Sequence, residues 1–262
     1  MSEDLFSVAG KVVVLTGGLG KLGKIFTAAL VERGARVAIF DRASGTAPSS
    51  ETLVLDVDVT DRRSVQAALA KVTDRWGAPS ALVNNAALDS PPDAPATENG
   101  PYETYPDSSW DDVLRVNVKG VHVCCQVIGG AMAAAGRGSI VNIGSIYGLV
   151  SPDQRIYKHR QTETGGFFKP VAYSVSKSAL LNLTRYLATY WAPRGVRVNT
   201  LTFGGVFANQ DAQFLEGYEH RVPLGRMARA EEYRAPLLFL LSDGASYMTG
   251  ANLVVDGGWT AW

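Results

Sequence analysis

Short runs of apolar residues, many of them β-branched, recur along the chain and alternate with amphipathic stretches of helical length. Several runs are apolar at nearly every position, as in Val12-Val13-Val14-Leu15. Strands of this kind fit a parallel sheet that is covered by helices on both faces, because neither face then meets water. The pattern predicts seven strands, over residues 12–16, 36–41, 53–57, 81–84, 139–143, 196–201 and 253–256.

The alternation of strands and helices continues along the whole chain. It predicts an α/β fold with a doubly wound parallel sheet in a three-layer αβα sandwich. The chain has 262 residues, of which 46% are hydrophobic, and this is enough to bury one substantial core. We therefore expect a single domain over residues 1–262.

Two segments interrupt the alternation and are predicted to be loops. Residues 88–107 contain prolines at five positions, which exclude a regular helix or a central strand. Residues 151–170 are polar, with two glycines near their end. Long loops in a compact domain are often functional, although tolerated surface insertions are the alternative. A third segment, 207–222, is interpreted as a helical substrate lid, and its aromatic residues could equally be core contacts.

The charge balance argues against large polyanionic partners. Lys plus Arg and Asp plus Glu both total 25, so the formal net charge is zero. Such a chain has no overall field to attract nucleic acid or an anionic membrane surface. Because the first ten residues include two acids and no long apolar run, we expect no targeting peptide, no membrane span and a cytoplasmic location.

The cysteines and histidines carry no evident chemistry. Cys124 and Cys125 are neighbours in a helical pattern, where their side chains point in different directions, so we expect two buried, reduced thiols. The three histidines are scattered without the spacing of zinc ligands, and no metal site is predicted.

A glycine-rich turn follows the first predicted strand. Residues 16–23 are Thr-Gly-Gly-Leu-Gly-Lys-Leu-Gly, and a helix is expected over 25–33. Glycines in this position let the backbone approach a pyrophosphate, while the helix N-terminus stabilises its negative charge. The turn therefore predicts a dinucleotide site in a Rossmann-type fold, and an ordinary tight connection is the alternative.

The end of the second predicted strand indicates which dinucleotide is bound. Asp41 stands there, about twenty residues after the glycines, where a carboxylate can bond both ribose hydroxyls. A 2′-phosphate would meet its negative charge, so Asp41 favours NAD over NADP. Arg42 and Lys21 argue the other way, since either could reach a phosphate.

Several further motifs appear in a fixed order after the glycine turn. They are Asp58-Val59, Asn84-Asn85-Ala86-Ala87, Val116-Asn117-Val118, Asn142-Ile143-Gly144-Ser145, Tyr173-Ser174-Val175-Ser176-Lys177, Arg197-Val198-Asn199 and Asp256-Gly257-Gly258. In this order the chain resembles the short-chain dehydrogenase/reductase family from about Gly10 to its C-terminus. The resemblance implies an NAD(P)-dependent oxidoreductase that acts on CH–OH groups.

The resemblance also assigns the cofactor site. Asp58 and the amide of Val59 would hold the adenine, the Asn-Asn-Ala segment would pass beneath the cofactor, and backbone groups near Val206 would hold the carboxamide. With the glycine turn and the catalytic pair, the implied cofactor residues are Gly17, Leu19, Lys21, Leu22, Gly23, Asp41, Arg42, Asp58, Val59, Asn85, Ala86, Ala87, Tyr173, Lys177 and Val206. As alternatives, Asp58 could cap a helix and Asn85 could only anchor a turn.

Catalysis is expected at Tyr173. A free tyrosine has a pKa of about 10, and a lysine four residues later on the same helix would lower it by stabilising the phenolate. Lys177 is that lysine, and by the resemblance it also binds the nicotinamide ribose. Ser145 would bond the substrate oxygen, and Asn117 would hold a water that links Lys177 to solvent. A Tyr and Lys that merely pack on an amphipathic helix are the alternative.

The chain departs from the family pattern at Lys21, Ala87, Phe203 and Ala208, and in its longer spacing between Ser145 and Tyr173. The extra residues, 151–170, bring a cluster of basic side chains, which are Arg155, Lys158, His159, Arg160 and Lys169. We hypothesise that part of this cluster binds an anionic or polyhydroxylated substrate, and a solvated basic loop is the alternative. The candidate substrate residues are Tyr147, Arg155, Arg160 and Phe207.

These inferences predict an NAD-dependent enzyme that transfers a hydride between nicotinamide and a small secondary alcohol or ketone, with sugar-like, polyol or anionic compounds as the candidate substrates. A homotetramer or homodimer is expected, because the apolar C-terminal segment resembles the one that family members pack between subunits. A catalytically idle NAD-binding protein, used in regulation or assembly, and a sugar dehydratase or epimerase are the alternatives.

Overall fold

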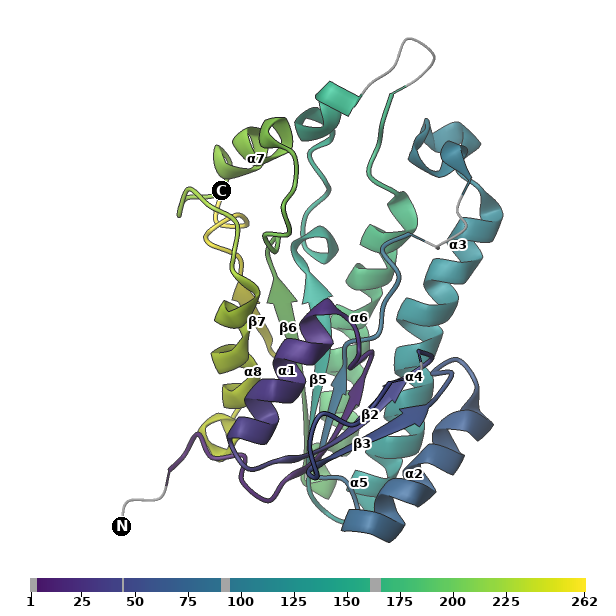
Figure 1. The fold of residues 1–262 in the computed structure, drawn as a ribbon, viewed down its shortest axis with the longest axis vertical. Helices are drawn as coiled ribbons and strands as arrows, with labels where there is room; N and C mark the ends of the chain where they lie inside the picture. The colour runs from purple at the N-terminus through teal and green to yellow at the C-terminus, as the bar shows by residue number, and fades with distance from the viewer. Residues whose placement is uncertain (1–3, 44, 91–94, 161–165) are drawn as a thin grey trace.

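A seven-stranded, all-parallel sheet forms the centre of the computed structural model, which describes residues 4–43, 45–90, 95–160 and 166–262 (Figure 1). The strand order is β3-β2-β1-β4-β5-β6-β7. The strands are β1 (Val12–Thr16), β2 (Arg36–Asp41), β3 (Thr52–Asp56), β4 (Ala81–Asn84), β5 (Gly138–Ser145), β6 (Val196–Phe203) and β7 (Asn252–Val255). The predicted doubly wound fold is confirmed. Because the order reverses between β1 and β4, a crevice opens at their carboxyl ends.

Helices cover both faces of the sheet. In Figure 1, α1 and α8 lie together on one face, and α2 and α4 lie on the side of the other. The helices are α1 (Lys21–Glu32), α2 (Arg62–Trp76), α3 (Asp107–Leu114), α4 (Val121–Cys124), α5 (Gly130–Ala134), α6 (Val171–Trp191), α7 (Ala212–Glu219) and α8 (Arg234–Leu241). Two π-helical segments, Arg115–Gly120 and Cys125–Gly129, join α3, α4 and α5 into one helical run.

The first strand shows why its sequence is continuously apolar. Val12 and Val14 pack in the core on the side of α2, α4 and α6, whereas Val13 and Leu15 pack in the core on the side of α1 and α8. Side chains alternate between the two faces of a strand, so both faces must be apolar when both are buried. Cys124 and Cys125 are free and buried in the first of these cores, as predicted.

A third apolar cluster lies beyond the carboxyl ends of the strands, where α7 meets the segment 151–170. Its buried members are Ile146, Tyr147, Ile156, Tyr157, Phe214, Tyr218, Val222, Met227 and Trp259. The amide of Phe168 donates to the carbonyl of Asn99 at 2.8 Å and so joins the two insertions, residues 88–107 and 151–170. Both predicted loops contain short 3₁₀ helices, at Ala96–Asn99, Tyr102–Thr104 and Gln154–Arg160. Among the described residues, no helix is long and apolar enough to cross a membrane.

Candidate active site

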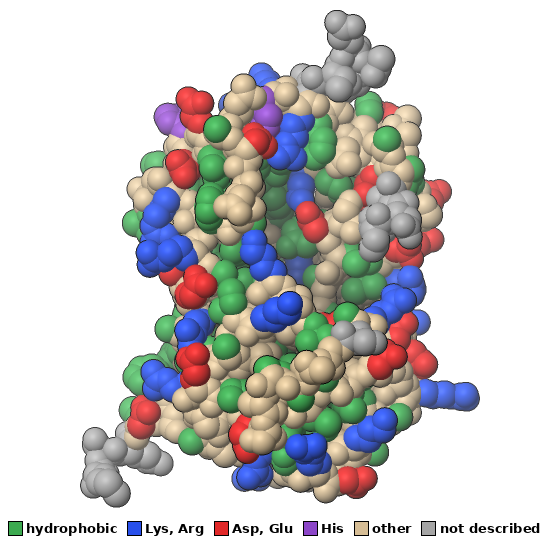
Figure 2. Space-filling view, in the orientation of Figure 1, with side chains coloured by type: hydrophobic (Ala, Val, Ile, Leu, Met, Phe, Trp, Pro, Cys, Tyr) green, Lys and Arg blue, Asp and Glu red, His purple; other side chains and the backbone are tan. Residues whose placement is uncertain are grey.

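A cavity of about 1100 Å³ opens at the carboxyl edge of the sheet, and Figure 2 shows the hollow, with apolar side chains inside it and charged ones at its rim. It extends from the glycine turn to α6 and the third apolar cluster. Most of the predicted site residues line it: Gly17, Leu19, Lys21, Leu22, Gly23, Asp41, Arg42, Asp58, Val59, Asn85, Ala86, Ala87, Ser145, Tyr147, Tyr173, Lys177 and Val206. The structure thus brings together residues that are far apart in the sequence.

The glycine turn is shaped by close backbone contacts. Gly17 has a φ of +65°, and a Cβ there would lie 2.8 Å from the Cα of Ala86. A Cβ on Gly23 would lie 2.2 Å from the carbonyl oxygen of Gly17, so only glycine lets the helix pack against the turn. As a result α1 begins at Lys21, four residues earlier than the predicted range 25–33.

The start of α1 has the properties of an anion site. Gly20 is its N-cap and provides no side chain to bond the first amides, and the first turn holds no acid. Lys21 places a cation at the positive end of the helix dipole, which is unfavourable unless an anion lies nearby. The residues present therefore fit the pyrophosphate of a dinucleotide.

Asp41 ties the second strand to the glycine turn. Its Oδ2 accepts from the amide of Leu19 at 2.9 Å, and its Oδ1 accepts from the amide of Ala43 at 3.0 Å. The carboxylate therefore has a fixed place at the cavity edge. It would face the ribose of a dinucleotide whose pyrophosphate lies on α1.

Asp58 is held beside the same part of the cavity. Its Oδ1 accepts from the amide of Thr60 at 2.8 Å and from the hydroxyl of Thr60 at 2.7 Å. Burial raises the pKa of Asp58, but these bonds and the charges of Arg42 and Arg115 outweigh it, so the pKa is lowered overall. The N-cap of α2 is Asp61, not Asp58.

Asn85 forms part of the cavity floor. Its side chain donates to the carbonyls of Thr16 and Gly17, both at 3.0 Å, and the hydroxyl of Thr16 accepts from the amides of Asn85 and Ala86. These bonds join the ends of β1 and β4. Asn85 therefore anchors the turn and lines the cavity at the same time.

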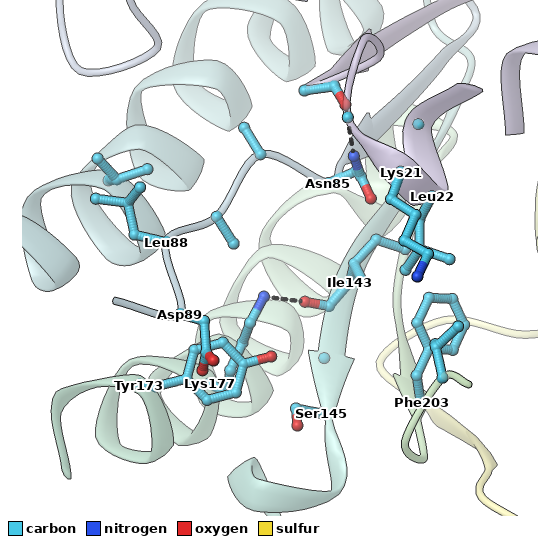
Figure 3. A pocket seen from close by; sticks show the side chains of 18 of the residues that line it. Lys21, Leu22, Asn85, Leu88, Asp89, Ile143, Ser145, Tyr173, Lys177 and Phe203 are labelled. Carbon is cyan, nitrogen blue, oxygen red and sulfur yellow. Dashed lines mark hydrogen bonds between the residues drawn. The ribbon is translucent and has the colours of Figure 1, made fainter. Parts of the chain in front are cut away.

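Tyr173 and Lys177 lie one helical turn apart on α6, and Ser145 ends β5 opposite them. Figure 3 shows the phenol of Tyr173 directed towards the space beside Ser145. The amine of Lys177 donates to the carbonyl of Ile143 at 2.8 Å and lies 5.7 Å from the centroid of the Tyr173 ring. A hydroxyl, a phenol and an amine thus converge on the cavity from two elements.

The protonation of this group differs from the sequence-based expectation. Burial and then the negative charge of Asp89 raise the pKa of Tyr173 to about 12, although the hydroxyl of Ser145 lowers it. Burial lowers the pKa of Lys177 to about 8, and Asp89 opposes this. The Lys177 amine is bonded to Ile143 and is itself desolvated, so it does not lower the Tyr173 pKa as expected. The effect of burial on Tyr173 is the larger one.

Asn117 lies behind the cavity wall and not on it. It is buried, its Oδ1 accepts from the amide of Leu88 at 2.7 Å, and its Nδ2 donates to the carbonyl of Leu88 and the hydroxyl of Ser176. That hydroxyl donates in turn to the carbonyl of Tyr173 at 2.7 Å. Asn117 therefore joins the segment after β4 to α6, and its water-holding role stays a prediction.

Three of the four substrate candidates lie elsewhere. Among the described residues around the cavity, Arg155, Arg160 and Phe207 do not appear, whereas Tyr147 does. Arg155 is 74% exposed and pairs with Asp153, and Arg160 pairs with Asp211 at 2.7 Å. Their charges are therefore balanced by acids within the structure.

Sequence analysis did not identify two charged residues of the site. Asp89 was not predicted, and Lys169 was only one member of the cation cluster, yet both line the cavity. The available signal was the position of each residue: Asp89 follows the Asn-Asn-Ala-Ala segment, and Lys169 stands four residues before Tyr173. Opposite charges beside two motifs that meet in the fold indicate an ion pair, which neither motif indicates on its own.

Comparisons with known proteins agree with this geometry. A family model described as enoyl-(acyl carrier protein) reductase matches residues 21–260. An NAD-dependent glycerol dehydrogenase from Listeria innocua is 31% identical over 97% of this chain and 96% of its own length. A D-threitol dehydrogenase from Mycolicibacterium smegmatis is 33% identical, with 97% and 95% covered.

Solved structures show the same fold. A short-chain dehydrogenase from Leptospira borgpetersenii with bound NAD⁺ has a TM-score of 0.87 at 30% identity, covering 99% of this chain and 96% of that one. A gluconate 5-dehydrogenase from Burkholderia cenocepacia, in complex with NADP and tartrate, has a TM-score of 0.82 at 26% identity, covering 99% and 98%. With the fold, the glycine turn and the length of these matches, the chain belongs to the short-chain dehydrogenase/reductase family of oxidoreductases.

Proposed function

We propose that this enzyme uses NAD to oxidise a secondary alcohol of a polyol or sugar-like compound, and catalyses the reverse reduction. The observation that carries the proposal is the convergence of Ser145, Tyr173 and Lys177 on a cavity that begins at the glycine turn. The similarity to proteins named glycerol and D-threitol dehydrogenase supports the substrate class. Screening sugar alcohols, hydroxy acids and ketones by the absorbance of reduced NAD tests it.

The side chains have separate tasks in this reaction. Bound NAD supplies the hydride acceptor. The Ser145 hydroxyl bonds the substrate oxygen and stabilises the charge that develops on it. Tyr173 accepts the hydroxyl proton when the alcohol is oxidised and returns it when the ketone is reduced. Lys177 holds positive charge near the phenolate and, by the family resemblance, orients the cofactor ribose.

The choice of NAD over NADP depends on Asp41. In the variant Asp41→Asn we expect the Kd for NADPH to fall about tenfold and the Kd for NADH to rise, because a carboxylate repels the 2′-phosphate and bonds the ribose hydroxyls. Fluorescence titration of the reduced cofactors measures both values. Asp74→Asn, an exposed acid on α2, is the control. Unchanged cofactor preference in Asp41→Asn would show that Arg42 or Lys21 determines it.

The protonation of Tyr173 predicts a pH dependence. Its pKa of about 12 means that the phenolate is scarce at neutral pH, and the groups around it are Asp89, Lys169, Lys177 and Ser145. Oxidation needs the phenolate, so kcat/KM for oxidation should rise with pH, about tenfold per unit, and less steeply once Lys177 loses its proton near pH 8. Reduction needs the phenol and should not rise. Oxidation that is fastest at acid pH would contradict this assignment.

We further propose that the chain assembles as a homodimer or homotetramer. Tyr186 and Tyr190 stack on the exposed side of α6, at 64% and 57% exposure, with ring centroids 6.1 Å apart. Aromatic residues gathered in this way on a helix are typical of a subunit contact. The molar mass in solution, compared with 28.0 kDa for one chain, tests the assembly.

A further inference from the structure

An ion pair joins the two insertions at the cavity wall. Oδ1 of Asp89, from the segment 88–107, accepts from Nζ of Lys169, from the segment 151–170, at 2.6 Å. The same ammonium also contacts the second carboxylate oxygen. The Lys169 side chain is only 16% exposed, whereas Asp89 is 59% exposed. Both residues line the cavity that contains Tyr173.

Each partner is held in place by backbone contacts of its own residue or of a neighbouring one. The amide of Lys169 donates to Oε1 of Gln154 at 2.8 Å, and the next residue, Pro170, is the N-cap of α6. On the other side, both backbone groups of Leu88 are bonded by the buried side chain of Asn117. The pair is therefore positioned from two directions by parts of the chain that also place Tyr173.

The pair lies against the reacting groups. Nζ of Lys169 is 5.5 Å from the centroid of the Tyr173 ring, and Figure 3 shows the Asp89 carboxylate beside that ring and the side chain of Lys177. The negative charge of Asp89 acts on both groups, since it raises the pKa of Tyr173 and of Lys177. Because the pair and Tyr173 line the same cavity, a substrate that reaches Tyr173 also lies near the pair.

We propose that Asp89 and Lys169 bind the hydroxyl next to the reacting one, and so select polyols over simple secondary alcohols. A hydroxyl can donate to the carboxylate and accept from the ammonium at the same time. The pair is neutral as a whole, so it does not favour an anionic substrate, and Arg155 and Arg160 pair with acids away from the cavity. This inference rests on the proposed function, because it names the subsite through which the enzyme would select polyols.

Substrates with and without hydroxyls beside the reacting one test the subsite. For threitol, Asp89→Asn and Lys169→Met should each raise KM about 10- to 100-fold, because a charge-assisted hydrogen bond is lost. The ratio of kcat/KM for threitol to kcat/KM for 2-butanol, which lacks the additional hydroxyls, should fall about 10- to 100-fold, because an effect of the lost charge on Tyr173 acts on both alcohols alike. The matched control is the pair between Lys11 and Asp243, at the opposite end of β1, with the variants Lys11→Met and Asp243→Asn.

Binding provides a readout that does not need turnover. Calorimetric titration of threitol into the protein with NADH should show the same 10- to 100-fold loss in Asp89→Asn. Equal losses for threitol and 2-butanol, or unchanged threitol binding, would overturn the subsite. So would a preference for D-gluconate that Lys169→Met removes and Asp89→Asn strengthens, because the pair would then recognise a carboxylate. If the native protein binds threitol through Asp89 but oxidises no alcohol, the subsite stands and the proposed function fails.

Discussion

Tyr173→Phe should lower kcat for alcohol oxidation by about 10³-fold and leave the Kd for NADH unchanged. The substitution removes only the phenolic oxygen, so the ring keeps its place near the ammonium groups of Lys169 and Lys177. What is lost is the group that takes the proton from the alcohol. Steady-state kinetics with a polyol substrate and fluorescence titration of NADH measure the two effects separately.

The control for this prediction is Tyr247→Phe, a fully exposed tyrosine that does not line the cavity. It should retain full activity. If Tyr173→Phe retained more than about a tenth of the activity, another group would carry the proton. Tyr147 and Tyr157 would be the first to examine, because both line the cavity and their hydroxyls lie 3.3 Å apart.

Lys177→Met should lower kcat by a comparable factor, about 10²- to 10³-fold, and also weaken NADH binding about tenfold. The variant loses the positive charge near the phenolate and leaves the carbonyl of Ile143 without its 2.8 Å bond. Because Lys177 acts on both the proton and the cofactor, its variant should differ from Tyr173→Phe, which affects turnover alone. The same two measurements separate them.

Lys71→Met, an exposed cation on α2, is the matched control for the lysine variant. If Lys177→Met kept the NADH affinity of the native enzyme, and its oxidation rate still rose less steeply above about pH 8, Lys177 would have no part in the site chemistry. The pair of variants also addresses the alternative of an idle NAD-binding protein. Such a protein would lose cofactor affinity in Lys177→Met but would show no turnover to lose in Tyr173→Phe.

The sequence predicted the sheet well because its signal is local. Strands β1, β2 and β4 have the predicted bounds, since each apolar run is bordered by polar or turn residues. β5 and β6 each continue two residues farther than predicted, because Gly144 pairs with Thr202 and Ser145 with Phe203. Pairing between distant strands is not visible in either run alone. Likewise α1 starts earlier than predicted because Gly23 packs against Gly17. In the sequence alone, Gly23 only interrupts the helical pattern, and this contact is not visible.

The candidate site was only partly predictable, for the same reason. Ser145, Tyr173 and Lys177 belong to motifs with fixed spacing, and the structure brings them to one cavity. The sequence predicted a lowered Tyr173 pKa, whereas the pKa is raised, because it depends on burial and on Asp89, which lies 84 positions away in the sequence. The cation cluster of 151–170 was visible, but only the fold shows that Lys169 reaches the cavity while Arg155 and Arg160 meet acids.

Isotope transfer tests the central claim most directly. The enzyme would be incubated with NAD and threitol that carries deuterium on its secondary carbons, and the mass of the reduced cofactor measured. Hydride transfer at this site predicts that NADH gains one deuterium from the substrate and that Tyr173→Phe nearly abolishes its formation. NADH without deuterium, or no reduced cofactor with any secondary alcohol of the panel, would contradict the account.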